Sequence, residues 1–190
     1  MIRSFIAIEV KNSEVLKNIS NFTERLKKNQ KQIKFVETEN IHMTIKFLGD
    51  IHESMAPKIY KILHEEVNEK IFAGKEYEYT IKGAGQFNKF SVLWVKLGGN
   101  IDFLQKIVNT VETELNEKLK IPRDKRPQFK PHITIGRLRS NKIDYKTFDI
   151  FKKLISDSKD IEFGSFKIKE VKLKKSILTQ KGPIYSDLVY

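Results

Sequence analysis

The sequence contains one short pattern twice. Residues 42–48 (HMTIKFL) and 132–138 (HITIGRL) both read His-x-Thr-Ile-x-x-Leu. Side chains at positions i and i+2 of a β-strand share a face. Each copy therefore predicts a strand with a histidine and a threonine on one face and apolar residues on the other. Two such strands indicate sheet structure with one buried face and one open polar face.

The alternation assigns individual side chains to each face. Lys46 has the parity of the open face, and a solvated surface lysine is the equal alternative. Arg137 has the parity of the buried face, but Gly136 allows a bulge that turns the guanidinium toward the open face. A structural salt bridge is the alternative for Arg137. The open faces are expected to carry His42, Thr44, His132 and Thr134, and the buried faces Met43, Ile45, Phe47, Ile133 and Ile135.

Composition narrows the class of protein. The chain has 190 residues, a formal net charge of +12 and no cysteine. Disulfides and thiolate metal sites are therefore excluded, and the positive charge favours a polyanion such as nucleic acid, with an ordinary solvated surface as the alternative. Glu9 interrupts the opening apolar segment, and no apolar run is long enough to span a bilayer. We expect a cytoplasmic protein.

The order of elements predicts an α+β fold. Strands are expected over residues 3–10, 34–36, 42–48, 78–87, 92–97, 132–138, 161–178 and 184–189, and helices from Ser13, around Pro57, over 101–119 and near 145–155. Alternating strands argue against a doubly wound parallel sheet. We expect a bilobal molecule in which two mostly antiparallel sheets face each other across a central cleft. Helices would cover the outer faces, with a pseudo-twofold relation. Residues 1–190 would form a single compact domain of two interleaved α+β lobes.

Two histidines and two threonines on facing surfaces have a specific chemical capacity. Histidine is the side chain whose ordinary pKa permits both an acid and a base role near neutral pH. A positioned acid or base contributes roughly 10²- to 10⁴-fold in rate. Threonine hydroxyls donate hydrogen bonds to phosphate oxygens. The set is therefore suited to acid–base chemistry on a phosphate ester without a metal ion.

At this level of detail the chain resembles a known family. The paired His-x-Thr motifs are the signature of the 2H phosphoesterase superfamily. Further segments resemble its RNA 2′,3′-cyclic phosphodiesterases, formerly called 2′-5′ RNA ligases. These segments are residues 3–8 (RSFIAI), 39–49 (ENIHMTIKFLG), 83–87 (GAGQF), 92–95 (VLWV), 126–137 (RPQFKPHITIGR) and 182–185 (GPIY).

The resemblance implies an activity and residue roles. The enzyme would open an RNA terminal 2′,3′-cyclic phosphate to a 2′-phosphomonoester, without a metal or cofactor. His42 would be the proton donor to the leaving 3′ oxygen and His132 the proton acceptor that activates water. Thr44, Thr134 and Arg137 would bind the phosphate. The partners would be RNA ends that carry the cyclic phosphate, tRNA-like fragments included, with no membrane and no obligate protein partner. The same acid and base would also serve a reversible joining of RNA ends through a 2′-5′ linkage.

Two other functions remain open from the residues alone. One is a cyclic phosphodiesterase for small molecules, and the other is an RNA-binding module that only captures phosphate ends. A matched acid and base argue against the second of these.

Other residues have less specific roles. His52 and His64 are expected to be structural or surface residues, and no metal-ligand spacing is present. Phe87 and Tyr185 would stack a terminal base or, more simply, pack in the core. A basic loop before the second motif would follow an RNA backbone or carry solvated charge; it comprises Arg123, Lys125, Arg126 and Lys130.

Overall fold

The computed structural model describes residues 1–125, 129–180 and 182–190. Within these ranges the strands form one curled sheet in which all pairings are antiparallel. The strand order is β7-β4-β5-β6-β3-β1-β8-β9, and β2 pairs with β6. The strands are β1 (Ile2–Glu9), β2 (Lys34–Phe35), β3 (His42–Ile51), β4 (Tyr77–Phe87), β5 (Val92–Gly98), β6 (His132–Arg137), β7 (Glu162–Ile168), β8 (Lys172–Leu178) and β9 (Pro183–Asp187).

Two of the helices, α1 and α3, begin at an asparagine cap. The Asn12 side chain accepts a hydrogen bond from Val15 N at 3.0 Å, and the Asn100 side chain accepts one from Phe103 N at 3.0 Å. The helices are α1 (Ser13–Lys27), α2 (Ala56–Ile62) with its π-helical continuation η3 (Leu63–Phe72), α3 (Ile101–Leu119) and α4 (Phe148–Ser156). Short 3₁₀ turns are η1 (Thr38–Asn40), η2 (Glu53–Met55) and η4 (Ser140–Lys142).

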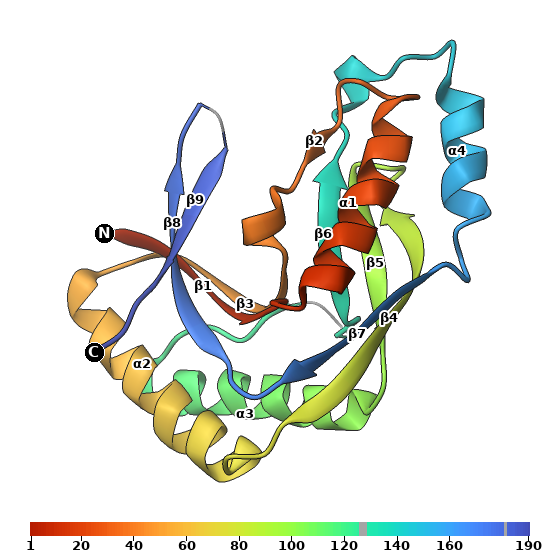
Figure 1. Cartoon of the computed structure of the whole chain (residues 1–190). Coiled ribbons are helices and arrows are strands. Elements are labelled where there is room, and N and C mark those ends of the chain that lie inside the picture. Colours follow the sequence, from red (N-terminus) through yellow and green to blue (C-terminus); the bar gives the residue numbers. More distant parts are fainter. Residues whose placement is uncertain (126–128, 181) are drawn as a thin grey trace.

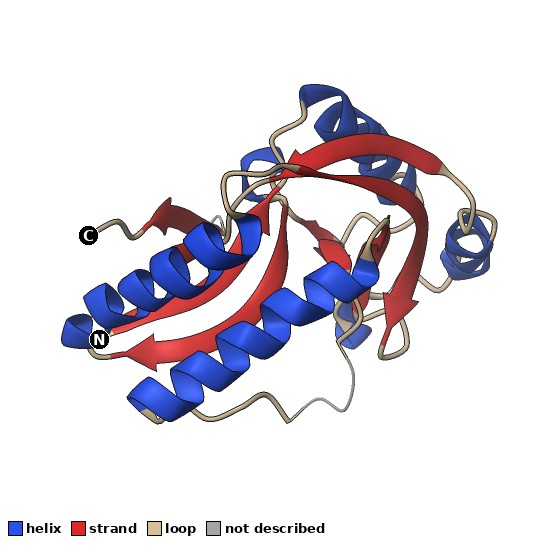
Figure 2. Cartoon of the chain, turned by 90° about the horizontal axis from the view of Figure 1, so that it is seen from below, coloured by secondary structure: helices blue, strands red, loops and turns tan. Residues whose placement is uncertain are grey.

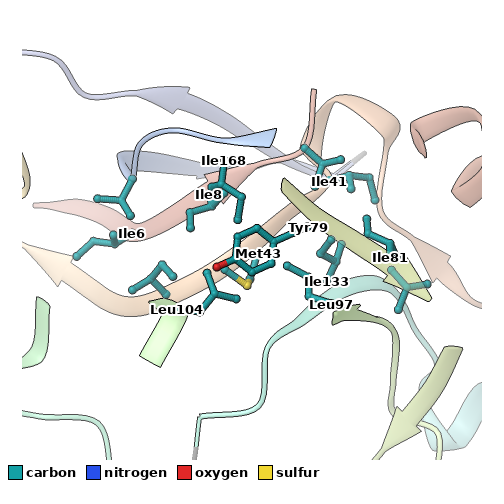
Figure 3. Packing of buried hydrophobic residues seen from close by; sticks show 14 of the residues in the cluster. Ile6, Ile8, Ile41, Met43, Tyr79, Ile81, Leu97, Leu104, Ile133 and Ile168 are labelled. Atoms are coloured by element: carbon teal, nitrogen blue, oxygen red, sulfur yellow. The ribbon is translucent and has the colours of Figure 1, made fainter. Parts of the chain in front are cut away.

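The sheet has two halves that meet between β6 and β3, one with β7, β4, β5 and β6 and the other with β3, β1, β8 and β9. Helices cover the outside of each half (Figures 1 and 2). α1 packs against β7 and β6, and α4 packs against β4, whereas α2 packs against β8 and α3 against β3. The chain alternates between the halves, because β1 lies in one half and the helix that follows it covers the other. One connected cluster of buried apolar side chains, including Met43 and Ile133, lies between sheet and helices (Figure 3).

The expected α+β class, antiparallel pairing and outer helices are confirmed. The expectation of two separate sheets is wrong, because β3 and β6 join the halves into one sheet. The junction is narrow: Met43 and Ile133 are the pair that links the two strands. The sheet therefore curls strongly at this point, and the pseudo-twofold relation stays a prediction.

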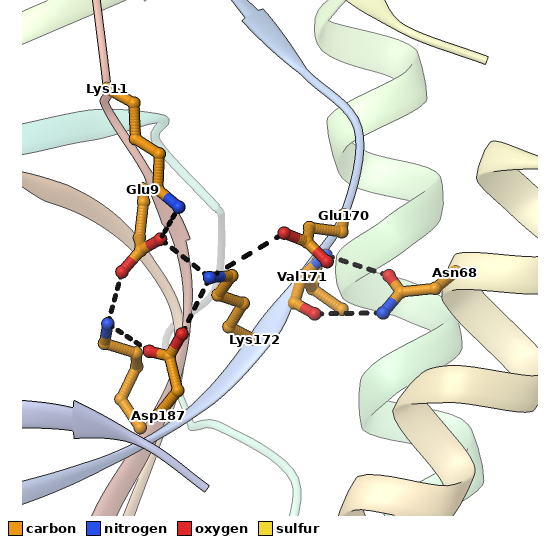
Figure 4. A network of polar contacts seen from close by, with 8 residues as sticks. Glu9, Lys11, Asn68, Glu170, Val171, Lys172 and Asp187 are labelled. Carbon is orange, nitrogen blue, oxygen red and sulfur yellow. Dashed lines mark hydrogen bonds and ion pairs between the residues drawn. The ribbon is translucent and has the colours of Figure 1, made fainter. Parts of the chain in front are cut away.

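The strand expected over residues 161–178 is two strands. β7 pairs with β4 in one half and β8 pairs with β1 in the other, so the segment crosses between halves. At the break, Val171 N donates to the Asn68 side chain at 2.9 Å, and Asn68 Nδ2 donates to Val171 O at 3.0 Å (Figure 4). The amide of Asn68 thus replaces a neighbouring strand where the ladder stops.

A bulge within the first motif changes the faces of β3 immediately after Thr44. Ala7 pairs with Thr44 but Ile6 pairs with Lys46, so Ile45 is an extra residue. Beyond it the alternation is reversed: Lys46 is buried and Phe47 is 62% exposed. The expected faces of Lys46 and Phe47 are therefore both wrong.

The second motif carries a bulge at the equivalent position. Trp94 pairs with Thr134 but Leu93 pairs with Gly136, so Ile135 is the extra residue in β6. Arg137, which follows Gly136, is exposed and lies on the same face of the sheet as Thr134. The bulge expected beside Gly136 is present, and it turns Arg137 toward the open face.

Candidate active site

The junction of β3 and β6 brings the two motifs together. In an antiparallel pair, residues on either side of a matched pair lie opposite one another. The Met43–Ile133 pair therefore sets His42 opposite Thr134 and Thr44 opposite His132. All four side chains are half-buried on the open face, while Met43 and Ile133 are fully buried behind them.

Both histidine rings are fixed by the same backbone contact. His42 Nδ1–H donates to Asn40 O at 2.6 Å, and His132 Nδ1–H donates to Lys130 O at 2.7 Å. A carbonyl accepts only, so these bonds place a proton on Nδ1 and make Nε2 the nitrogen that changes its protonation state. His42 Nε2 lies 3.1 Å from Thr44 Oγ1.

Aromatic rings enclose the imidazoles. Tyr185 packs edge-on against His42 at 5.4 Å between centroids, and Phe87 packs edge-on against His132 at 5.1 Å. Phe5 lies 4.9 Å from His42. The structure thus places Phe87 and Tyr185 beside the histidines, where they restrict the ring orientations.

A network of charged side chains connects Glu9 to Lys172 and Asp187 (Figure 4). Glu9 is the β1 partner of His42. Lys172 Nζ lies 3.0 Å from Glu9 Oε2 and 2.7 Å from Asp187 Oδ2, and Lys174 bonds to both carboxylates. Burial raises the pKa of Glu9, but the lysine ammonium groups outweigh this and hold the pKa at about 2. The Glu9 carboxylate is therefore ionised throughout the neutral range.

Sequence reasoning missed this network. A carboxylate at the end of the otherwise apolar β1 was the available signal. Its partners Lys172, Lys174 and Asp187 lie more than 160 residues away in the chain and become neighbours only through strand pairing.

Burial lowers the pKa of His42 below its ordinary value. The hydrogen bond to the Asn40 carbonyl and the Glu9 charge oppose the shift, and the Lys174 charge adds to it. In the ligand-free site, the neutral ring is therefore favoured, and a bound anion would favour the charged ring.

Arg137 is exposed at the end of β6. Burial raises the pKa of the Tyr185 hydroxyl on β9, and the positive charges of Arg137 and Arg3 oppose that shift. The charge of Arg137 therefore acts on a tyrosine that packs against His42.

Lys46 does not belong to the open face. Its ammonium group donates to both Glu112 oxygens, at 2.8 and 2.7 Å, and to Pro122 O at 2.9 Å. These bonds connect β3 to α3 and to the loop that leads to β6. Lys46 is therefore a buried structural residue, and neither of its expected roles is correct.

The remaining sequence candidates are two histidines and the basic loop that leads to the second motif. His52 accepts from Ser54 N at 3.3 Å at the start of η2, and His64 lies 3.3 Å from Glu69 on the surface. In the basic loop, Arg123 donates to Thr113 at 3.2 Å, and Lys125 and Lys130 are exposed. Arg126 lies outside the described residues.

Within residues 1–125, 129–180 and 182–190, no three His, Cys, Asp or Glu side chains are grouped so as to hold a metal ion. No helix of that part of the chain combines the length and apolar character needed to cross a membrane.

Comparison with known proteins identifies a family from the sequence and a shared fold from solved structures. Residues 4–187 match the family model described as AKAP7 2′5′ RNA ligase-like domain. The RNA 2′,3′-cyclic phosphodiesterase of Methanocaldococcus jannaschii is 36% identical, with 96% of each chain covered. That of Methanothermobacter thermautotrophicus is 30% identical over 98% of this chain and 96% of its own. Among solved structures, apo LigT of E. coli has a TM-score of 0.71 at 20% identity, covering 99% of this chain and 95% of LigT.

The fold, the paired motifs and these matches define the class: the chain belongs to the 2H phosphoesterase family. Within that family its curated relatives are RNA 2′,3′-cyclic phosphodiesterases.

Proposed function

We propose that this chain is an RNA 2′,3′-cyclic phosphodiesterase that opens the cyclic phosphate to a 2′-phosphomonoester without a metal ion. The relatives named for this activity share 30% and 36% identity over nearly the whole chain. The observation that carries the proposal is the antiparallel register at Met43 and Ile133, because it opposes each histidine to the other motif's threonine.

In this mechanism each step uses a residue of the two motifs. His132 Nε2 takes a proton from water, and the water oxygen bonds to phosphorus. The bond between phosphorus and the 3′ oxygen breaks, and His42 Nε2–H protonates that oxygen. Thr44, Thr134 and Arg137 donate hydrogen bonds to the non-bridging oxygens as their charge grows. The products are a 2′-phosphate and a 3′-hydroxyl.

A neighbouring charge supports the role of His42. The strand partner of His42 is the carboxylate Glu9. A negative neighbour favours a charged imidazole. Burial and Lys174 lower the pKa of His42 in the free enzyme, so the negative charge of the bound phosphodiester would complete its protonation.

The charge of Glu9 should affect how kcat/KM depends on pH. The kcat/KM of an enzyme that needs protonated His42 falls as the pH rises through the free-enzyme pKa of this residue. Glu9→Gln removes a charge that raises the pKa and leaves Lys172 and Lys174 less compensated. We expect the alkaline limb of the kcat/KM profile to move to lower pH.

The matched control is Glu162→Gln, which removes an exposed carboxylate paired with Lys82 at 3.3 Å. Its profile should coincide with that of the unaltered enzyme. A limb that moves to higher pH in Glu9→Gln would contradict the assignment of His42 as the proton donor.

The proposed function is tested by product analysis. An RNA oligonucleotide ending in a 2′,3′-cyclic phosphate is incubated with the enzyme in the presence of EDTA, and the product terminus is identified by ³¹P NMR. We expect a 2′-phosphate at an unchanged rate. A 3′-phosphate product, or a rate abolished by the chelator and restored by a divalent metal, would contradict the proposal.

RNA joining and the small-molecule alternative would use the same site. The same acid and base would serve 2′-5′ joining of RNA ends, because a 5′-hydroxyl can take the place of water as the group that attacks the cyclic phosphate. A rate on a 2′,3′-cyclic mononucleotide equal to that on RNA would favour a small-molecule enzyme instead.

We also propose that residues 1–190 act as one domain of two interleaved lobes with a pseudo-twofold relation. Three shared features of the motif strands support it: the bulge after each threonine, the Nδ1 contact two residues upstream, and the edge-on aromatic ring. A cytoplasmic location stays a prediction.

A further inference from the structure

A cavity of about 480 Å³ lies on the β4–β5 side of the candidate site, between these strands and α4. Its lining combines two aromatic rings, Phe90 and Trp94, with three lysines, Lys96, Lys152 and Lys159. The lysines are exposed. The lining includes no carboxylate, whereas each of three other cavities of the described chain is lined by at least two.

Strand register connects this cavity to the motifs. Trp94 is the β5 partner of Thr134, and Lys96 is the β5 partner of His132. Gly85 on β4 is in turn the partner of Trp94. Paired residues share a face, so Thr134, Trp94 and Gly85 form a row across the open face that spans two strand spacings, about 10 Å.

Ring contacts follow the same direction. Phe87 lies 5.1 Å from His132 and 5.2 Å from Trp94, measured between ring centroids. The Trp94 indole lies across Gly85 so closely that a Cβ at this glycine would come within 2.3 Å of ring atoms. The absence of a side chain at Gly85 therefore gives Trp94 its place at the edge of the cavity.

We propose that this cavity is a second nucleotide subsite, which binds the nucleotide immediately 5′ to the cyclic phosphate end. This inference rests on the proposed function. The base of this second nucleotide would stack on Trp94 or Phe90, and the phosphate of the same nucleotide would contact Lys96 and Lys159. Stacking rings beside a positively charged groove are the usual means of binding single-stranded nucleic acid. Lys152 is 2.6 Å from Asp149 and is the least available of the three lysines.

The subsite would make the enzyme an RNA-end enzyme in preference to a mononucleotide one. A 2′,3′-cyclic mononucleotide has no 5′ neighbour and would leave the cavity empty. The ratio of kcat/KM for a cyclic-ended tetranucleotide to kcat/KM for the cyclic mononucleotide with the same base therefore measures occupancy of the cavity.

The test compares this ratio in three proteins. The unaltered enzyme should favour the tetranucleotide, and Lys159→Glu should lower the ratio about tenfold through loss of a charged phosphate contact. In Lys159→Glu, the negative slope of log kcat/KM for the tetranucleotide against log salt concentration should become shallower by about 0.7. Lys58→Glu makes the same charge change at an exposed position on α2, in the other half, and should leave the ratio unaltered.

A second substrate tests the stacking rings without altering the protein. A tetranucleotide that lacks the base of its penultimate nucleotide should lose at least about fivefold in kcat/KM. No loss with this substrate, equal losses on both substrates in Lys159→Glu, or an equal decrease of the ratio in Lys58→Glu would each overturn the subsite. If the unaltered enzyme opened neither substrate, the proposed function itself would fail. If it opened both equally well, the subsite would fail and the small-molecule alternative would be favoured, whereas the opening of the cyclic phosphate itself would stand.

Discussion

Replacement of either His42 or His132 by alanine should lower kcat on a cyclic-ended RNA by at least 10²-fold, since each imidazole supplies one proton transfer. The rings are held by backbone carbonyls at 2.6 and 2.7 Å, so alanine removes the reacting nitrogen without breaking a strand pair. Steady-state kinetics measures the loss, and circular dichroism checks that the fold is kept.

The double variant makes this prediction sharper. If the two imidazoles act in the same step, removing both should cost little more than removing one. His64→Ala is the matched control, because this histidine is exposed on η3, where it lies 3.3 Å from Glu69 and packs against the Tyr60 ring. Full activity in either single variant would refute the mechanism.

Lys46→Met should lower the free energy of unfolding by about 3–5 kcal/mol, because it leaves a buried carboxylate without its cation. The side chains of Lys46 and Glu112 are 4% and 12% exposed, and their closest contact is 2.7 Å. The remaining contact of Glu112 Oε2 would be the hydrogen bond from Asp124 N at 3.1 Å. Urea titration followed by tryptophan fluorescence measures the change.

Two further variants separate pairing from other causes. Lys46→Met combined with Glu112→Leu should recover most of the loss, because no charge then stays unpaired. Lys61→Met breaks an exposed pair with Glu65 at 3.7 Å and should cost less than about 1 kcal/mol. A single cooperative transition in the unaltered protein would also support one domain. A Lys46→Met variant as stable as Lys61→Met would contradict the buried ion pair.

The open face could be predicted from sequence only as far as the alternation continued. His42 and Thr44 share a face with His132 and Thr134 because the His-x-Thr part of each motif precedes the bulge in its strand. One residue later the rule fails, since Ile45 is extra in its ladder and exchanges the faces of Lys46 and Phe47. A bulge depends on the partner strand, and the sequence of one strand does not determine it.

Long-range pairing limited the prediction in two other places. The segment 161–178 reads as one strand, but its two ends find different partners, β4 and β1, in opposite halves. Glu9 reads as the polar end of an apolar strand, and its importance follows from pairing with His42 and from contacts with Lys172 and Lys174. The resemblance along the whole chain was enough to predict the family, whereas these neighbours became known only from the strand pairing in the structure.

The account depends on two imidazoles acting on one phosphorus atom. A crystal structure with a nucleoside 2′,3′-cyclic phosphate or a vanadate analogue bound at the β3–β6 junction tests this most directly. We predict that Nε2 of His42 and Nε2 of His132 each lie about 2.6–3.2 Å from different oxygens of the same phosphorus or vanadium. An analogue bound by one histidine alone, with the other too far away to reach it, would contradict the account.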